Sequence, residues 1–192
     1  MMNVFVLCTG RCGSTTFAKA ASHASNATSG HETHASKIGA ARLAYPPAHI
    51  EADNRLSWML GRLEARWGDQ ARYVHLIRDP EATARSFTQR ISTGIISAYR
   101  RDIIMGSERR KTGISDFDFA MDYVETVNAN IEQFLRYRRH RMTVRLETAK
   151  PDFAEFWYWA GLSGDLDAGL AEWDILHNAG RAHLNAAPPL PA

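Results

Sequence analysis

The sequence lacks the features that would place the protein in a membrane or outside the cell. No apolar run approaches the length of a membrane span, and a predicted strand begins within three residues of the start, without the segments of a secretion signal. Two cysteines, Cys8 and Cys12, are too few for a disulfide framework, and a bridge between them would distort the strand end. We expect a soluble, cytoplasmic protein without stable membrane insertion.

The sequence also lacks strong charge and any convincing metal motif. A formal net charge of +2 over 192 residues argues against a general nucleic-acid binder. His31 and His34 have H-x-x-H spacing, but no further ligand stands at a suitable distance, so we expect no metal. With no repeat or linker in view, we assign residues 1–186 to one domain and expect a disordered Pro-rich tail over 187–192.

The most informative stretch that is present covers residues 4–20. An apolar run, V-F-V-L, ends at T-G, and glycines and hydroxyl residues then lead into a helix-compatible segment. This order predicts a strand, a tight loop and a helix N-terminus, where unpaired N–H groups and the helix dipole attract an anion. The alternative is a turn that needs glycine for steric reasons only. Ser14 stands where G-x-x-x-x-G-K-[ST] has lysine, and the basic residue, Arg11, comes earlier.

A second stretch repeats the order of a buried strand followed by a helix. Residues 72–77 are predicted to form the strand, which runs into Arg78, Asp79 and Pro80. Pro80 suits a first helical turn. A charged group at Arg78 and a hydroxyl at Ser86 would together bind another phosphate. The alternative is an Arg–Asp pair beside a helix cap.

The two stretches, T-G-R-C-G-S-T-T at 9–16 and H-L-I-R-D-P-x-x-x-x-x-S at 75–86, resemble the nucleotide-binding segments of the sulfotransferase family. Members of that family use 3′-phosphoadenosine 5′-phosphosulfate (PAPS) and release adenosine 3′,5′-bisphosphate. The resemblance implies that the first segment holds the 5′-phosphosulfate and that an arginine and a serine of the second hold the 3′-phosphate. At Cys12 many members carry serine.

The resemblance assigns site residues one by one. It implies that the donor-binding residues are Thr9, Gly10, Arg11, Cys12, Gly13, Ser14, Thr15, Thr16, Arg78 and Ser86. Residues 177–185 are expected to fold back over the nucleotide, with Arg181 as a phosphate contact. The run Arg109-Arg110-Lys111 is interpreted as surface charge, because the family's R-K-G segment lies near the C-terminus.

The base is sought in residues 30–34, G-H-E-T-H, which follow the first predicted helix. Composition alone favours solvated polar residues here. Many carbohydrate-type and bacterial sulfotransferases place a glutamate base in this segment, so the resemblance implies Glu32, with His31 and His34 as alternatives. Arg11 is expected to stabilise developing charge. His34 and, around the next predicted strand, three further residues are candidates for acceptor binding: His49, Glu51 and Asn54. For Asp53 and Asn54, the structural alternative is a helix cap.

Strands that alternate with helices predict a three-layer α/β/α sandwich with a mainly parallel sheet of roughly four or five strands. The resemblance makes this the P-loop NTPase-like sulfotransferase fold. Beyond the segments above, the pattern predicts strands over 49–53 and 142–146 and helices over 35–43, 54–63, 81–105 (with a break near Gly94), 115–135 and 151–161.

The expected function is sulfuryl transfer from PAPS to a hydroxyl or amine of an unidentified small-molecule, glycan or lipid acceptor. One rival is a nucleotide-dependent kinase with Asp79 as its magnesium ligand, although the missing loop lysine and Pro80 argue against it. The other rival is a non-catalytic nucleotide- or partner-binding module.

Overall fold

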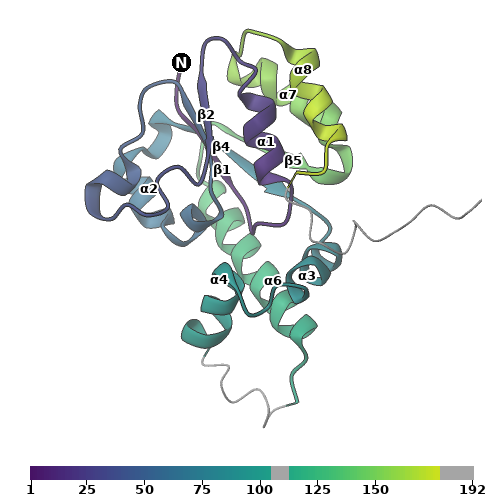
Figure 1. Ribbon diagram of the computed structural model, residues 1–192. Coiled ribbons are helices and arrows are strands. Elements are labelled where there is room, and N and C mark those ends of the chain that lie inside the picture. The colour runs from purple at the N-terminus through teal and green to yellow at the C-terminus, as the bar shows by residue number, and fades with distance from the viewer. Residues whose placement is uncertain (105–112, 178–192) are drawn as a thin grey trace, which may run out of the picture.

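The computed structural model describes residues 1–104 and 113–177, and its centre is a parallel sheet of five strands. In spatial order the strands are β2 (Thr28–His31), β3 (His49–Ala52), β1 (Val4–Leu7), β4 (Arg72–Ile77) and β5 (Arg141–Arg145). All four neighbouring pairs run parallel, and helices cover both faces of the sheet (Figure 1). The predicted three-layer α/β/α sandwich is confirmed.

One face of the sheet is covered by α1 (Ser14–Ala21), α7 (Ala149–Ala160) and α8 (Leu166–Ala171). The other face is covered by α2 (Leu60–Arg66) and α6 (Asp116–Leu135), and α3 (Pro80–Thr88) packs against α6, with α4 (Gly94–Ala98) nearby. Short helical turns link these elements: η1 (Gly39–Leu43), η2 (Asn54–Trp58), η3 (Gly68–Gln70), η4 (Tyr99–Ile103), η6 (Leu146–Thr148) and η7 (Glu172–Asp174).

The central strand β1 shows why the sequence reads as a continuous apolar run. Its four residues are fully buried, because side chains alternate between two covered faces. Val4 and Val6 belong to the core beneath α1 and α7, whereas Phe5 and Leu7 belong to the core beneath α2 and α6.

Local signals explain most helix boundaries. Ser115 and Asp118 form a reciprocal capping box at the start of α6, and Gly161, in the left-handed region, ends α7. Asp53 caps η2, which settles the choice between Asp53 and Asn54. The helix that starts at Pro80 ends at Thr88, and α4 starts at Gly94, where the break was predicted.

Three sequence expectations about elements were wrong or incomplete. Strand β2 was not predicted, because T-S-G-H contains no apolar residue and the strand lies at the sheet edge, where it pairs only with β3. The helix expected over 35–43 is only the short turn η1. The helix expected over 54–63 divides into η2 and α2 at Met59.

Within the described part of the chain, no helix is long and apolar enough to cross a membrane. Because all five strands are parallel, their carboxyl ends share one edge of the sheet. Ligands of open α/β sheets bind outside this edge, where strand order reverses about a central strand. Here β1 is that strand, with β3 on one side and β4 on the other.

Candidate functional site

The loop between β1 and α1 is built around backbone conformations that favour glycine. Gly10 and Gly13 have φ values of 85° and 92°, and Arg11 between them has φ 59°. A Cβ atom on Gly10 would lie 2.7 Å from Asn54 Nδ2, and one on Gly13 would lie 2.9 Å from Leu146 Cδ1. The glycines are therefore required both for the turn and for the close approach of neighbouring elements.

The same loop delivers the first turn of α1 to a cleft at the sheet edge. Gly13 is the N-cap and has no side chain, so no side chain caps the helix. The N–H of Phe17 makes the first helical hydrogen bond, to Gly13 O at 2.8 Å. Ser14, Thr15 and Thr16, which precede it, line the cleft. Uncapped N–H groups at a helix start favour an anion there.

Arg11 joins the two sequence motifs into one cationic wall. Its Nε donates to Ser86 Oγ at 3.0 Å, and its carbonyl oxygen accepts from Arg78 Nη1 at 3.2 Å. The pKa of the Arg11 guanidinium is lowered, first by burial and then by the charges of Arg90 and Arg78. Positive groups held this close together repel one another, and a bound anion would offset that repulsion.

The cleft has a volume of about 600 Å³. Its lining also includes apolar residues: Leu146 directly after β5, Trp173 in η7, Ile175 and Leu176. Trp173 packs edge-on against Phe17 of α1, with ring centroids 6.2 Å apart, which holds the Trp173 ring beside the loop.

His31 and Glu32 reach the cleft from the end of β2. His31 Nε2 lies 3.0 Å from Ser14 Oγ and 3.5 Å from Thr15 Oγ1, so the imidazole adjoins the start of α1. Glu32 has φ 54° and forms an ion pair with Arg55, at 2.5 Å between Oε2 and Nη1. A non-glycine residue at positive φ is uncommon, and such strain concentrates at functional sites.

Asn54 lies at the end of β3 and lines the same cleft. Its Nδ2 approaches Thr9 O at 3.5 Å, and its Oδ1 is buried without a hydrogen-bond partner among the described residues. Asn54 is the predicted acceptor-binding residue that the structure brings to the cleft.

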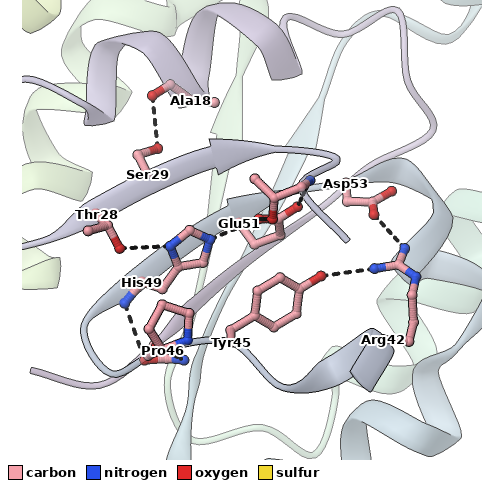
Figure 2. Close-up of polar contacts among 11 residues, drawn as sticks. Ala18, Thr28, Ser29, Arg42, Tyr45, Pro46, His49, Glu51 and Asp53 are labelled. Atoms are coloured by element: carbon pink, nitrogen blue, oxygen red, sulfur yellow. Dashed lines mark hydrogen bonds and ion pairs between the residues drawn. The ribbon is translucent and has the colours of Figure 1, made fainter. Parts of the chain in front are cut away.

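The other three predicted acceptor-binding residues do not line the cleft. His49 and Glu51 are 6% and 0% exposed and form a buried chain beneath β2. Thr28 Oγ1 lies 2.8 Å from His49 Nδ1, and His49 Nε2 lies 2.9 Å from Glu51 Oε2 (Figure 2). His34 stacks on Tyr45, with ring centroids 4.3 Å apart, and burial lowers the pKa of His34. These contacts make the three residues part of the wall behind the site.

Two predicted donor-binding residues also lie in the wall rather than on the surface of the cleft. Thr9 is 3% exposed, and its carbonyl oxygen accepts from Tyr123 Oη at 2.7 Å. Cys12 is fully buried, and both Cys8 and Cys12 are free thiols. A hydrogen bond with Cys8 lowers the pKa of Cys12. Residues 178–185 of the polar C-terminal segment, with Arg181, lie outside the described residues, as do Arg109, Arg110 and Lys111.

The site contains residues that sequence reasoning missed. Two of them, Arg55 and Arg90, could have been found from the sequence because they lie near predicted site residues. Arg55 directly follows Asn54, and Arg90 lies four residues after Ser86. Arg42 is only 1% exposed and forms an ion pair with Asp53, at 2.5 Å between Nη2 and Oδ2 (Figure 2). Asp53 also accepts from the N–H of Arg55 at 2.8 Å. No local sequence pattern marks Arg42 as buried, because its partner, Asp53, is eleven residues further along the chain.

Comparisons with known proteins bear on the fold. No protein-family model matches the sequence, and no curated protein matches it. Among solved structures, a sulfotransferase domain from the curacin biosynthetic pathway aligns with a TM-score of 0.60 and 13% sequence identity. The alignment covers 86% of this chain and 75% of that domain. The described part of this chain therefore has a sulfotransferase-like fold.

Proposed function

We propose that this protein is a sulfotransferase that transfers a sulfuryl group from PAPS to an acceptor hydroxyl or amine. The observation that carries the proposal is the bridging position of Arg11. Its side chain contacts Ser86 and its carbonyl oxygen contacts Arg78, so two motifs that are far apart in the sequence lie together in the cleft, as phosphate binding by both would require. A donor with phosphate at two positions needs such a pair of sites.

The residues present fit this donor by their chemistry. The glycine loop and the first turn of α1 offer N–H groups and hydroxyls for the 5′-phosphosulfate. Arg78, Ser86 and Arg90 offer two guanidinium groups and a hydroxyl for the 3′-phosphate. Trp173 and the apolar residues around it offer a surface on which an adenine would stack.

PAPS supplies an activated sulfuryl group, and the protein's task is positioning and charge stabilisation, as in phosphoryl transfer. In this proposal, Arg11 and the N–H groups at the start of α1, which border the cleft, would stabilise charge on the departing oxygen. Glu32 or His31 would accept the acceptor's proton, since both line the cleft. General-base assistance of this kind typically contributes about a hundred- to ten-thousandfold in rate.

Calorimetric titration with adenosine 3′,5′-bisphosphate, beside ATP with magnesium, tests the donor. We expect the bisphosphate to bind and Arg78→Ala to weaken it by about ten- to a hundredfold, because a charged hydrogen bond is lost. Arg139→Ala is the matched control, since Arg139 is 83% exposed and lies outside the cleft.

If the protein binds ATP with magnesium more tightly than the bisphosphate, the kinase hypothesis would be favoured instead. The position of Asp79 speaks against that outcome, because its carboxylate accepts from the N–H of Ala82 at 2.8 Å and thereby caps α3. Binding of neither nucleotide would leave a non-catalytic module with this fold.

A further inference from the structure

The ion pair between Glu32 and Arg55 differs from the other charged contacts of the cleft in how it is supported. The two side chains remain partly accessible, at 30% exposure for Glu32 and 38% for Arg55, and both residues line the cleft. Their backbones are held from behind by buried carboxylates: Glu51 binds the N–H of Thr33, and Asp53 binds the N–H of Arg55. The main chain is held by these contacts, while the two side chains keep part of their surface open to the cleft.

Arg55 has hydrogen-bonding capacity that the described residues do not use. Its guanidinium carries five N–H donors, but its side-chain contact in this part of the chain is the ion pair from Nη1 to Glu32. Nη1 is buried and makes no hydrogen bond of good geometry with the described residues. The planar fork of an arginine matches the two oxygens of a carboxylate, phosphate or sulfate.

Arg55 also lies on the opposite side of the loop from the proposed donor contacts. It follows β3, whereas Arg78 follows β4, and these two strands flank β1 on either side. A donor held by Arg78 and Ser86 leaves the β3 side of the cleft, with Glu32, Asn54 and Arg55, for the acceptor.

In this arrangement one oxygen of the proposed base is already paired with Arg55. Glu32 Oε2 faces the guanidinium, so the carboxylate cannot approach an acceptor hydroxyl through that oxygen until Arg55 moves. A neutral acceptor cannot replace the ion pair that Arg55 forms with Glu32. An acidic group on the acceptor can, because it would form an equivalent ion pair with Arg55.

We propose that Arg55 is a specificity-determining residue that binds an oxyanion on the acceptor (a carboxylate, phosphate or sulfate) and in doing so releases Glu32. This inference rests on the proposed function. The released carboxylate takes the proton of the acceptor hydroxyl as the hydroxyl oxygen forms its bond to sulfur. The bond from sulfur to the bridging oxygen breaks, and its electron pair leaves with adenosine 3′,5′-bisphosphate.

The binding step is tested by NMR on protein labelled with ¹⁵N at arginine, with adenosine 3′,5′-bisphosphate at saturation to fill the donor site. Glycerol 3-phosphate is the probe, and glycerol is the neutral control. We expect a saturable shift of one arginine Nε–H signal with the phosphate alone. The shift should be lost in Arg55→Gln and retained in Arg139→Gln. No saturable shift, or the same shift in Arg55→Gln, would overturn the proposal.

Glu32→Gln tests the exchange of partners from the other side. Removing the carboxylate frees Arg55, so glycerol 3-phosphate should bind about tenfold more tightly than to the wild type. Unchanged or weaker binding would show that the ion pair does not compete with the ligand, and the release of Glu32 would be refuted. If adenosine 3′,5′-bisphosphate does not bind, the proposed donor is refuted. The titration with glycerol 3-phosphate, repeated in the Arg78→Ala protein, then still tests whether Arg55 binds an oxyanion.

Discussion

Glu51 holds Thr33 by two hydrogen bonds, accepting from its N–H at 2.7 Å and from its hydroxyl at 2.5 Å. Glu51 is fully buried, and among the described residues its remaining hydrogen bond is with His49. A carboxylate without solvent is tolerable only when its oxygens are satisfied in this way. Thr33 directly follows Glu32, so the buried carboxylate fixes the segment that presents the proposed base.

The Glu51→Gln protein should therefore lose stability and turnover while it keeps donor binding. The amide replaces one acceptor oxygen with a donor, and we expect a loss of about 1–3 kcal/mol in the free energy of unfolding. Urea unfolding measures that loss. Calorimetry with adenosine 3′,5′-bisphosphate should give an unchanged affinity, because the proposed donor contacts are in the segments that follow β1 and β4.

Thr33→Val is the matched control for this prediction. It removes the hydroxyl but keeps the N–H that donates to Glu51. The loss of stability should be smaller than in Glu51→Gln. An equal loss of bisphosphate affinity and of turnover in Glu51→Gln would contradict a positioning role.

Much of the fold was predictable because its signals are local. The strand β1 is a continuous apolar run, β4 is apolar except for Arg72 and His75, and Pro80 and Ser115 mark helix starts. The edge strand β2 was missed because T-S-G-H has no apolar residue; its place is fixed by pairing with β3, which is a tertiary effect.

The candidate site was predictable only where a motif spans it. Arg11, Arg78 and Ser86 meet as the two motifs implied. The resemblance suggests His49 and Glu51 as acceptor contacts, because sulfotransferases often place such residues near this strand, yet both side chains lie on one face of β3 and are buried. Arg42 carried no signal, because its burial depends on its pairing with Asp53.

Gly13→Ala should damage both the loop and the donor site. The new Cβ would lie 2.9 Å from Leu146 Cδ1, and φ is 92°, so contact and backbone strain add. We expect about 1–3 kcal/mol lower unfolding free energy, together with loss of bisphosphate binding. Gly61→Ala, in helix α2 with nothing within 4 Å of its Cβ, should instead be neutral or stabilising. Equal unfolding midpoints for the two variants in urea would refute the argument.

The buried pair of Arg42 and Asp53 should be costly to break from one side. The two residues are 1% and 0% exposed. Asp53→Asn leaves the guanidinium without a buried counter-charge, which should cost about 3–5 kcal/mol in urea unfolding. Arg42→Met combined with Asp53→Asn should cost less than the sum of the single changes. Strict additivity would mean that the two side chains are not coupled.

His75 should make the protein less stable in mild acid. It is 4% exposed in β4, and burial lowers its pKa, an effect that the hydrogen bond to Asn128 at 3.2 Å opposes only in part. The unfolded chain therefore takes up a proton near pH 6.5, before the folded protein does. The contribution of His75 to stability is complete above that pH and is lost as the pH falls toward the lowered pKa of the folded protein.

In urea unfolding between about pH 7.5 and pH 5, the free energy of unfolding of His75→Gln should fall less steeply than that of the wild type. His34, whose pKa is also lowered, is present in both proteins, so the difference isolates His75. Parallel curves would show that burial of this imidazole does not couple folding to pH.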